Sequence, residues 1–374
     1  MRLRKKEGGQ FKFGYWLRKS PNYFLVFILI LILITLFYLD LKFGGTGSTV
    51  VNVASCSQAD VQNAVNAAVD GDIIICPAGS WSWATPVTIN KNIEVRGAGS
   101  SSTIITPSSQ AFVITGSKPF DINGFKFVGP GSQTVGFINV ASTGAGDGWR
   151  IHHNWFVDAS ARGLWVGSEN SDTPYGLIDH NTFTVTSDLI NQQGMTIFGC
   201  SYDCRKINFM ALMGTIDAVY IEDNIFDFYW RSDGVMDTGG AARVVFRYNT
   251  VHGATPGNHG TDSGGRLGTA YLEIYGNTFT GKAIGFRPLD VVALRSGTGV
   301  IYNNNVTGDF ASYIVYLRNY RSVGVESWGG MCDGTNWRVS YPASSLSTTG
   351  TYGFCSITRD QICNWGVDSQ CPAG

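Results

Sequence analysis

The stretch Ile151-His-His-Asn154-Trp-Phe156 decides the fold, because the same frame returns five more times along the chain. The copies are Ile178-Asp-His-Asn181-Thr-Phe183, Ile221-Glu-Asp-Asn224-Ile-Phe226, Phe246-Arg-Tyr-Asn249-Thr-Val251, Ile274-Tyr-Gly-Asn277-Thr-Phe279 and Ile301-Tyr-Asn-Asn304-Asn-Val306. Successive asparagines are 27, 43, 25, 28 and 27 residues apart. A repeat of this period is typical of a solenoid, in which each copy belongs to one coil.

Each copy favours strands over helices, because it holds a short β-branched or aromatic stretch followed by Gly, Asn and Asp turn residues. Stacked copies would form parallel strands about 4.8 Å apart. The asparagines would then form a column in which side-chain amides bond to one another and satisfy polar groups in a bend. The sequence therefore predicts an all-β chain with the architecture of a parallel β-helix.

The segment Ser57-QADVQNAVNAAVDGDIIICPAGSW predicts a helix that covers the open end of this core, since Val61, Ala64, Val65 and Ala68 recur at helical spacing. It resembles the entry of right-handed parallel β-helix proteins of the pectate-lyase-like superfamily. The stretch NHGTDSGGRLGTAYLEIYGNTF (258–279) resembles extracellular members without an assigned activity. The resemblance implies a single-stranded right-handed parallel β-helix of about eight coils over residues 56–318, with an N-terminal capping helix.

The N-terminal region predicts one transmembrane helix ahead of the β-helix. Residues 1–20 are basic, 21–40 are apolar and uncharged up to Asp40, and about twenty helical residues span a bilayer. The basic flank places the N-terminus in the cytoplasm, so the main domain is expected to be extracellular or periplasmic. A cleaved signal peptide, which would give a secreted protein, is the alternative. Residues 41–55 are interpreted as a linker and 319–374 as a Cys/Trp-rich C-terminal cap.

The distribution of charge and cysteine disfavours two classes of function, nucleic-acid binding and zinc binding. The first 23 residues hold seven basic and one acidic residue, so a chain of net charge −1 has a mildly acidic remainder, which disfavours nucleic-acid binding. All eight cysteines follow the apolar segment, where disulfides are expected. Proximity favours the pairs Cys56–Cys76, Cys200–Cys204, Cys332–Cys355 and Cys363–Cys371. Cysteine and histidine spacings do not match a zinc site.

Candidate catalytic residues come from counting forward from each ladder asparagine. The thirteenth residue after Asn224, Asn249 and Asn277 is an aspartate, which predicts an acidic column on neighbouring coils. Basic side chains stand close to the same offset and complete one face. The expected catalytic residues are Asp237, His259, Asp262, Asp290, Arg287 and Arg295, and the expected substrate-binding residues are Asp233, Trp230, Arg266 and Trp165.

Such a column permits several chemistries. Carboxylates about 5 Å apart suit a retaining glycosidase, and those about 9.6 Å apart lie near the inverting range. Asp237 and Asp262 would also suit calcium, which could bridge a uronate while His259 or an arginine abstracts a proton. The alternative is that Asp237-Thr-Gly-Gly and Asp262-Ser-Gly-Gly are ordinary turns. Likewise, Trp165 and Trp230 either stack on sugars or pack beneath loops.

Comparison with characterised enzymes of the fold leaves the activity open. Leu177-Ile-Asp179-His180 resembles a W-I-D-H segment of pectate lyases, but it lies inside the ladder frame, so we expect Asp179 and His180 to be turn residues. The R-x-P-x-x-R signature of those enzymes is absent, since Pro288 directly follows Arg287. The sequence predicts a membrane-anchored extracellular protein that binds an extended polysaccharide, with lyase- or hydrolase-like cleavage left open. A non-catalytic glycan-binding or adhesive protein and a structural surface protein are the alternatives.

Overall fold

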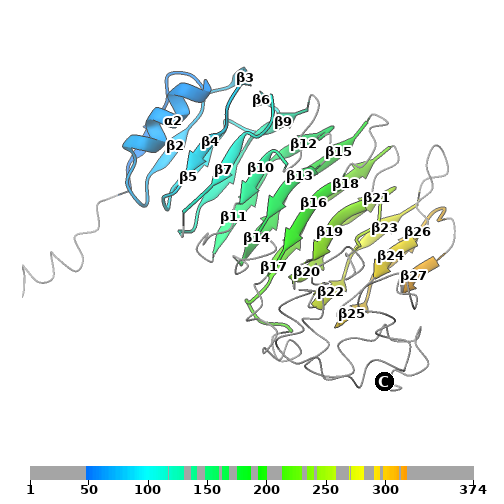
Figure 1. Ribbon diagram of the computed structural model, residues 1–374. Helices are drawn as coiled ribbons and strands as arrows, with labels where there is room; N and C mark the ends of the chain where they lie inside the picture. Colours follow the sequence, from blue (N-terminus) through cyan, green and yellow to red (C-terminus); the bar gives the residue numbers. More distant parts are fainter. Residues whose placement is uncertain are drawn as a thin grey trace, which may run out of the picture. The chain divides into compact units, whose positions relative to one another are not determined.

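The computed structural model describes most of the chain between residues 48 and 317 (Figure 1). The described ranges are 48–116, 118–129, 136–140, 148–159, 162–167, 175–186, 193–199, 213–229, 234–239, 242–257, 269, 271–281, 290–294, 298–310 and 313–317. Residues 1–47 lie outside these ranges.

Three parallel sheets, here called A, B and C, make up the solenoid, and all strand pairings between described residues are parallel. Sheet A contains β1 Val50–Asn52, β2 Ile73–Ile75, β5 Glu94–Arg96, β8 Asp121–Asn123, β11 Trp149–His152, β14 Gly176–Asp179, β17 Val219–Glu222, β20 Arg243–Arg247, β22 Tyr271–Tyr275 and β25 Thr298–Tyr302. Sheet B contains β3 Gly79–Trp83, β6 Thr103–Pro107, β9 Lys126–Val128, β12 Trp155–Val157, β15 Thr182–Val185, β18 Ile225–Phe228, β21 Thr250–His252, β23 Thr278–Thr280 and β26 Asn305–Thr307. Sheet C contains β4 Val87–Ile89, β7 Phe112–Ile114, β10 Ile138–Val140, β13 Arg162–Val166, β16 Gln193–Phe198 and β19 Gly234–Gly239.

The predicted parallel β-helix is therefore confirmed, and it is of the right-handed type. The solenoid has about seven turns, against the eight or so that were expected. Two further strands, β24 Asp290–Leu294 and β27 Tyr313–Leu317, pair with each other. Sheet A begins at Val50, inside the segment that we interpreted as a linker.

The core consists of side chains that repeat in register from coil to coil. In sheet A the residues that the register aligns with Ile151 point inward, and Ile122, Ile151, Ile178 and Ile221 are all fully buried. In sheet B the inward position is mostly phenylalanine, with the rings of Phe156 and Phe183 stacked 4.7 Å apart. Because strand side chains alternate, the residues on either side of these core positions point outward.

The asparagine column lies at the bend between sheets A and B. The Asn224 side-chain nitrogen donates to Asn249 Oδ1 at 3.1 Å and to the Ile178 carbonyl at 2.9 Å. The Asn224 Oδ1 accepts from the backbone and side-chain nitrogens of Asn181. The same pattern continues from Asn154 to Asn304. Amides and carbonyls buried at the bend are thus satisfied by neighbouring coils, as the sequence predicted.

Helix α2 (Gln58–Ala67) closes the N-terminal end of the core, as predicted. Ser57 caps its N-terminus, while Val61 and Val65 are buried. The Gln62 amide accepts from the backbone nitrogen of Thr88 at 2.8 Å and donates to its carbonyl at 3.2 Å. The side chain of Gln62 therefore satisfies backbone groups of β4 that a further strand would otherwise bond.

Several further predictions can be placed against the described residues. The predicted disulfide Cys56–Cys76 is present. The other six cysteines, the apolar segment 21–40 and the cap 319–374 lie outside the described residues. Within the described ranges, none of the helices combines the length and the apolar composition that a membrane crossing requires.

The asparagine column predicts position-dependent stability. Asn224→Ala should lower the free energy of unfolding by about 2–4 kcal/mol, because it leaves buried groups on two coils without partners. Asn304→Ala, in the half-buried last copy, should cost less. Urea unfolding followed by circular dichroism measures both. Asn139→Ala, on the outer side of sheet C, is the control, and an equally mild effect of Asn224→Ala would contradict the role of the column.

Candidate functional site

The outer side of sheet A carries a group of interacting polar side chains. Strand register aligns two outward columns, one four residues and one two residues before each ladder asparagine. We call these two columns the polar strip. The first column contains Asp121, Arg150, Leu177, Tyr220, Val245, Glu273 and Val300. The second contains His152, Asp179, Glu222, Arg247, Tyr275 and Tyr302.

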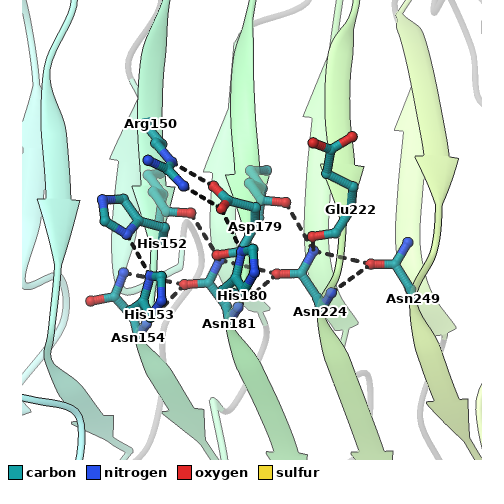
Figure 2. Close-up of polar contacts among 12 residues, drawn as sticks. Arg150, His152, His153, Asn154, Asp179, His180, Asn181, Glu222, Asn224 and Asn249 are labelled. Atoms are coloured by element: carbon teal, nitrogen blue, oxygen red, sulfur yellow. Dashed lines mark hydrogen bonds and ion pairs between the residues drawn. The ribbon is translucent and has the colours of Figure 1, made fainter.

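Arg150 and Asp179 join neighbouring coils through a bidentate ion pair. Arg150 Nε donates to Asp179 Oδ1 at 2.8 Å, and Arg150 Nη2 donates to Oδ2 at 2.6 Å (Figure 2). The Asp179 side chain is only 3% exposed. Burial alone would raise the pKa of Asp179, but hydrogen bonds from Arg150 and His180 outweigh it and hold that pKa below its usual value. Asp179 is therefore a carboxylate at neutral pH.

Three histidines lie beside this ion pair (Figure 2). His152 Nε2 lies 3.0 Å from Asp121 Oδ1, and its Nδ1 lies 2.6 Å from Nδ1 of His153. The His153 and His180 rings are parallel, with centroids 5.0 Å apart. The Nδ1 of His180 lies 2.7 Å from Asp179 Oδ2. We call His152, His153 and His180 the histidine cluster.

The histidine cluster favours a neutral His153. Burial and the positive charges that His152 and His180 acquire on protonation lower the pKa of His153. A single proton must also serve both Nδ1 atoms of the close pair His152 and His153, which disfavours full protonation of both rings. His153 is therefore an imidazole base at neutral pH, which is the form required for proton abstraction.

The backbone explains why two of these rings stand outward at the bend. His153 and His180 precede ladder asparagines and have φ of 54°. Asp223, Tyr248 and Asn303 occupy the same place in later coils with φ of 56°, 58° and 53°. Non-glycine residues rarely adopt this left-handed conformation, so the asparagine bonds that hold the bend also hold these side chains.

Arg247 is the centre of an aromatic region farther along the polar strip. Its Nε donates to Glu222 at 2.5 Å, its Nη1 donates to the Tyr275 hydroxyl at 2.9 Å, and its guanidinium lies 4.8 Å from the Tyr220 ring centroid. Burial would lower the pKa of Arg247, but these hydrogen bonds outweigh it and raise the pKa above its ordinary value. The Tyr302 ring stacks on Tyr275 at 4.8 Å and remains 52% exposed.

Two hollows lie along the polar strip. The larger has a volume of about 580 Å³ and includes Arg150, Leu177, Tyr220 and Glu222 in its lining. The smaller, of about 360 Å³, includes Glu94 and Asp121. Both are lined by Gly148 and Arg150, so the two hollows are neighbours on this side of sheet A.

The predicted acidic column can be followed only in part. Asp237 lies in strand β19 and not in a turn, and the strand register aligns it with Gly257 and Ala293. Asp290 is three residues before Ala293 and is 6% exposed, so these two aspartates do not share a column. The predicted site residues Trp230, Asp233, His259, Asp262, Arg266, Arg287 and Arg295 lie outside the described residues.

Two further predictions concern Trp165 and a metal site. Trp165, on β13, is half-buried, packs 5.1 Å from Phe198 and donates from Nε1 to the Gly167 carbonyl, as the packing alternative expects. Within the described ranges, His, Cys, Asp and Glu side chains do not gather into a group of three that could hold a metal. The predicted calcium pair of Asp237 and Asp262 stays a prediction, because Asp262 lies outside those ranges.

Sequence reasoning missed the polar strip because it counted forward from each asparagine. The charged residues stand two and four places before the asparagine, inside the repeat itself. His180 is in the bend, as expected of a turn residue, but Asp179 faces outward and pairs with Arg150. The signal was present in the printed repeat: His152, Asp179, Glu222 and Arg247 share one position in four successive copies.

Comparisons with known proteins find similar structures but no matching sequence. Neither a family model nor a curated protein matches the chain. A PL6-family alginate lyase structure has 16% identity and a TM-score of 0.44, and the match covers 70% of this chain and 40% of that one. An alginate lyase from Paenibacillus sp. has 15% identity and a TM-score of 0.41, with 72% and 99% covered. The A-module of an Azotobacter vinelandii mannuronan C-5 epimerase has 14% identity and a TM-score of 0.28, again with 72% and 99% covered.

These likenesses are low, and the chain spans less than half of the first structure. The fold assignment therefore rests on the strand pairing of this chain, and its chemistry has to be argued from the polar strip.

The lowered pKa of His153 predicts how stability depends on pH. Because the folded protein resists protonation of His153, the unfolded chain takes up the proton first as the pH falls below about 6.5. Stability that is present above this pH should be lost as the pH falls toward the folded-state pKa. His153→Asn removes the titrating group and keeps a residue type that occupies the same bend at Asn303.

Melting temperatures between pH 7.5 and 5 should therefore fall less steeply in His153→Asn than in the unchanged protein. Asp179 has its pKa lowered from 3.8, so its stabilising effect is lost only as the pH falls below that value, in a separate window. Identical slopes of the two proteins above pH 5 would contradict the proposed state of His153.

Proposed function

We propose that the chain binds an extended polysaccharide along the polar strip of sheet A. The observation that carries this proposal is the alignment of charged, imidazole and tyrosine side chains in two columns beside two neighbouring hollows. A polymer lying along the solenoid would meet one pair of outward side chains at each coil, about 4.8 Å apart. Solenoid faces of this kind suit extended ligands because the contact surface grows with the number of coils.

The chemistry of the polar strip suits sugars. Arg150 is paired with Asp179 and Arg247 with Glu222, so the strip offers directed hydrogen bonds more than net positive charge. Guanidinium and carboxylate groups hydrogen-bond to hydroxyls in fixed directions. The exposed faces of Tyr302 in the strip and of Tyr248 in the neighbouring bend, each 52% exposed, would stack on sugar rings. This combination favours a hydroxyl-rich polymer over nucleic acid.

A second candidate function is cleavage of an acidic polysaccharide by elimination, and the histidine cluster favours it. Neutral His153 would take the proton from the carbon beside a uronate carboxylate. The electrons of that C–H bond would form a carbon–carbon double bond while the neighbouring glycosidic C–O bond breaks, and the leaving oxygen would take up a proton. The polymer is thus split without water being added.

We also propose that residues 21–40 anchor the protein in a membrane with the β-helix outside the cytoplasm. The support is the charge pattern of residues 1–40, in which a basic segment precedes an uninterrupted apolar one. Release of the protein by detergent, and not by high salt, would be the expected behaviour of an anchored form.

Tyr302→Ala tests glycan binding by the polar strip. It should weaken retention on a polysaccharide by about 2- to 12-fold, since an aromatic contact contributes about 0.5–1.5 kcal/mol. Tyr229→Ala is the matched control, because Tyr229 is 56% exposed but follows β18 of sheet B. Affinity electrophoresis with neutral and acidic polysaccharides measures both variants. Equal mobility of the two variants on every retained polymer would show that the strip is not the binding surface.

The elimination predicts products that absorb near-ultraviolet light when an acidic polysaccharide is incubated with the protein. His153→Asn should abolish this absorbance and leave polymer retention in place, because the tyrosines are untouched. Absence of unsaturated product at every pH between 5 and 9, with retention intact, would leave the protein a non-catalytic glycan binder.

A further inference from the structure

The larger hollow differs in chemistry from the polar strip that it borders. Its volume of about 580 Å³ is within the range of sites for small molecules. Arg150, Glu222 and Arg247 give the hollow a polar lining on one side, whereas Leu177, Ile216 and Ala218 give it an aliphatic lining. A ligand there would meet hydrogen-bonding groups at one side and apolar surface at the other.

One wall of this hollow is a fixed part of the structure. Residues 213–217 cross the outer side of sheet A as the chain returns from the longest coil. The Tyr220 hydroxyl donates to the Thr215 carbonyl at 2.5 Å, and the Tyr271 hydroxyl donates to the Asp217 carbonyl at 3.2 Å. The Gly214 backbone nitrogen donates to Glu273 Oε1 at 2.8 Å. Three strand residues therefore hold the wall in place, so the shape of the hollow is set before a ligand arrives.

The wall presents an exposed apolar side chain to this hollow. Ile216 is 85% exposed, and Leu177 on the facing strand β14 is half-buried. Covering such surfaces is favourable for an apolar group and unfavourable for a hydroxyl, which would lose its hydrogen bonds to water. An unsubstituted sugar ring would bring hydroxyls to this wall, whereas an acetyl group would bring a methyl.

We infer that the larger hollow binds an acetyl substituent of the polysaccharide, so that the protein selects acetylated sugars. This inference rests on the proposed glycan binding by the polar strip. The acetyl methyl lies against Ile216 and Leu177, and the acetyl carbonyl accepts a hydrogen bond from a guanidinium at the rim, Arg150 or Arg247. The shared chemistry is a methyl next to a carbonyl, and it occurs both as an O-acetyl ester and as an N-acetyl amide.

Two matched pairs of probes test the inference and distinguish its two sources. Acetylated xylan and the same xylan after mild alkali differ only in O-acetyl groups, while hexamers of β-1,4-linked N-acetylglucosamine and glucose differ in the N-acetyl group. We expect the full-length protein to bind the acetylated member of at least one pair about fourfold more tightly, the value for burying one methyl group. The pair that shows the preference identifies the linkage.

Ile216→Ser should remove this preference without weakening the binding of the unacetylated member, and Leu177→Ser should remove the preference as well. The control is Val300→Ser, which makes a similar change in the same outward column at β25, away from the lining of the hollow. Ile216 is too exposed for its replacement to disturb folding. Isothermal titration calorimetry and affinity electrophoresis give the affinity ratios.

The outcomes separate the two proposals. Equal affinity within both pairs, or a preference that both serine variants retain, would overturn the acetyl site while the proposed glycan binding stands. Failure of the unchanged protein to retain any polysaccharide would overturn the proposed function and the acetyl site together. A preference lost in Ile216→Ser and kept in Val300→Ser would support the site.

Discussion

The hydrogen bonds between stacked asparagine side chains are the constraint on which the rest of the structure depends. Each one ties the bend of one coil to the bend of the next and satisfies amides that cannot reach water. Because the bends are fixed one above another, the strands before them are in register, and so are the side chains on both sides of sheet A. The packing of the core and the alignment of the outward columns both follow from these hydrogen bonds between coils.

The inward and outward sides of sheet A use this register differently. On the inward side, the register places isoleucine next to isoleucine of the neighbouring coil, so that the buried apolar surface is continuous between coils. Outward, it places unlike charges beside each other, as in Arg150 with Asp179 and Arg247 with Glu222. A slip by one residue would bury the charges and expose the isoleucines, so the two faces exclude alternative registers together.

The sequence predicted the architecture well because strands, bends and the capping helix depend on local patterns that repeat. It predicted the polar strip poorly for a physical reason. Positions before an asparagine are tied to it by strand geometry and keep their alignment, whereas positions after it pass through loops of different length. Asp237 and Asp290 share an offset of thirteen residues in sequence, yet the register separates them by three. Residues at equal offsets across a loop therefore need not lie in one column, whereas residues at equal offsets along a strand do.

Gln62 has a consequence for how the protein coexists with copies of itself. The first strand of a parallel solenoid offers the same unpaired backbone groups that let fibrous assemblies grow, one chain templating the next. At Thr88 those groups are occupied by a single side-chain amide from the helix above. The helix therefore covers a strand edge as well as the end of the apolar core, and its removal would expose backbone groups with which a strand of another chain could pair.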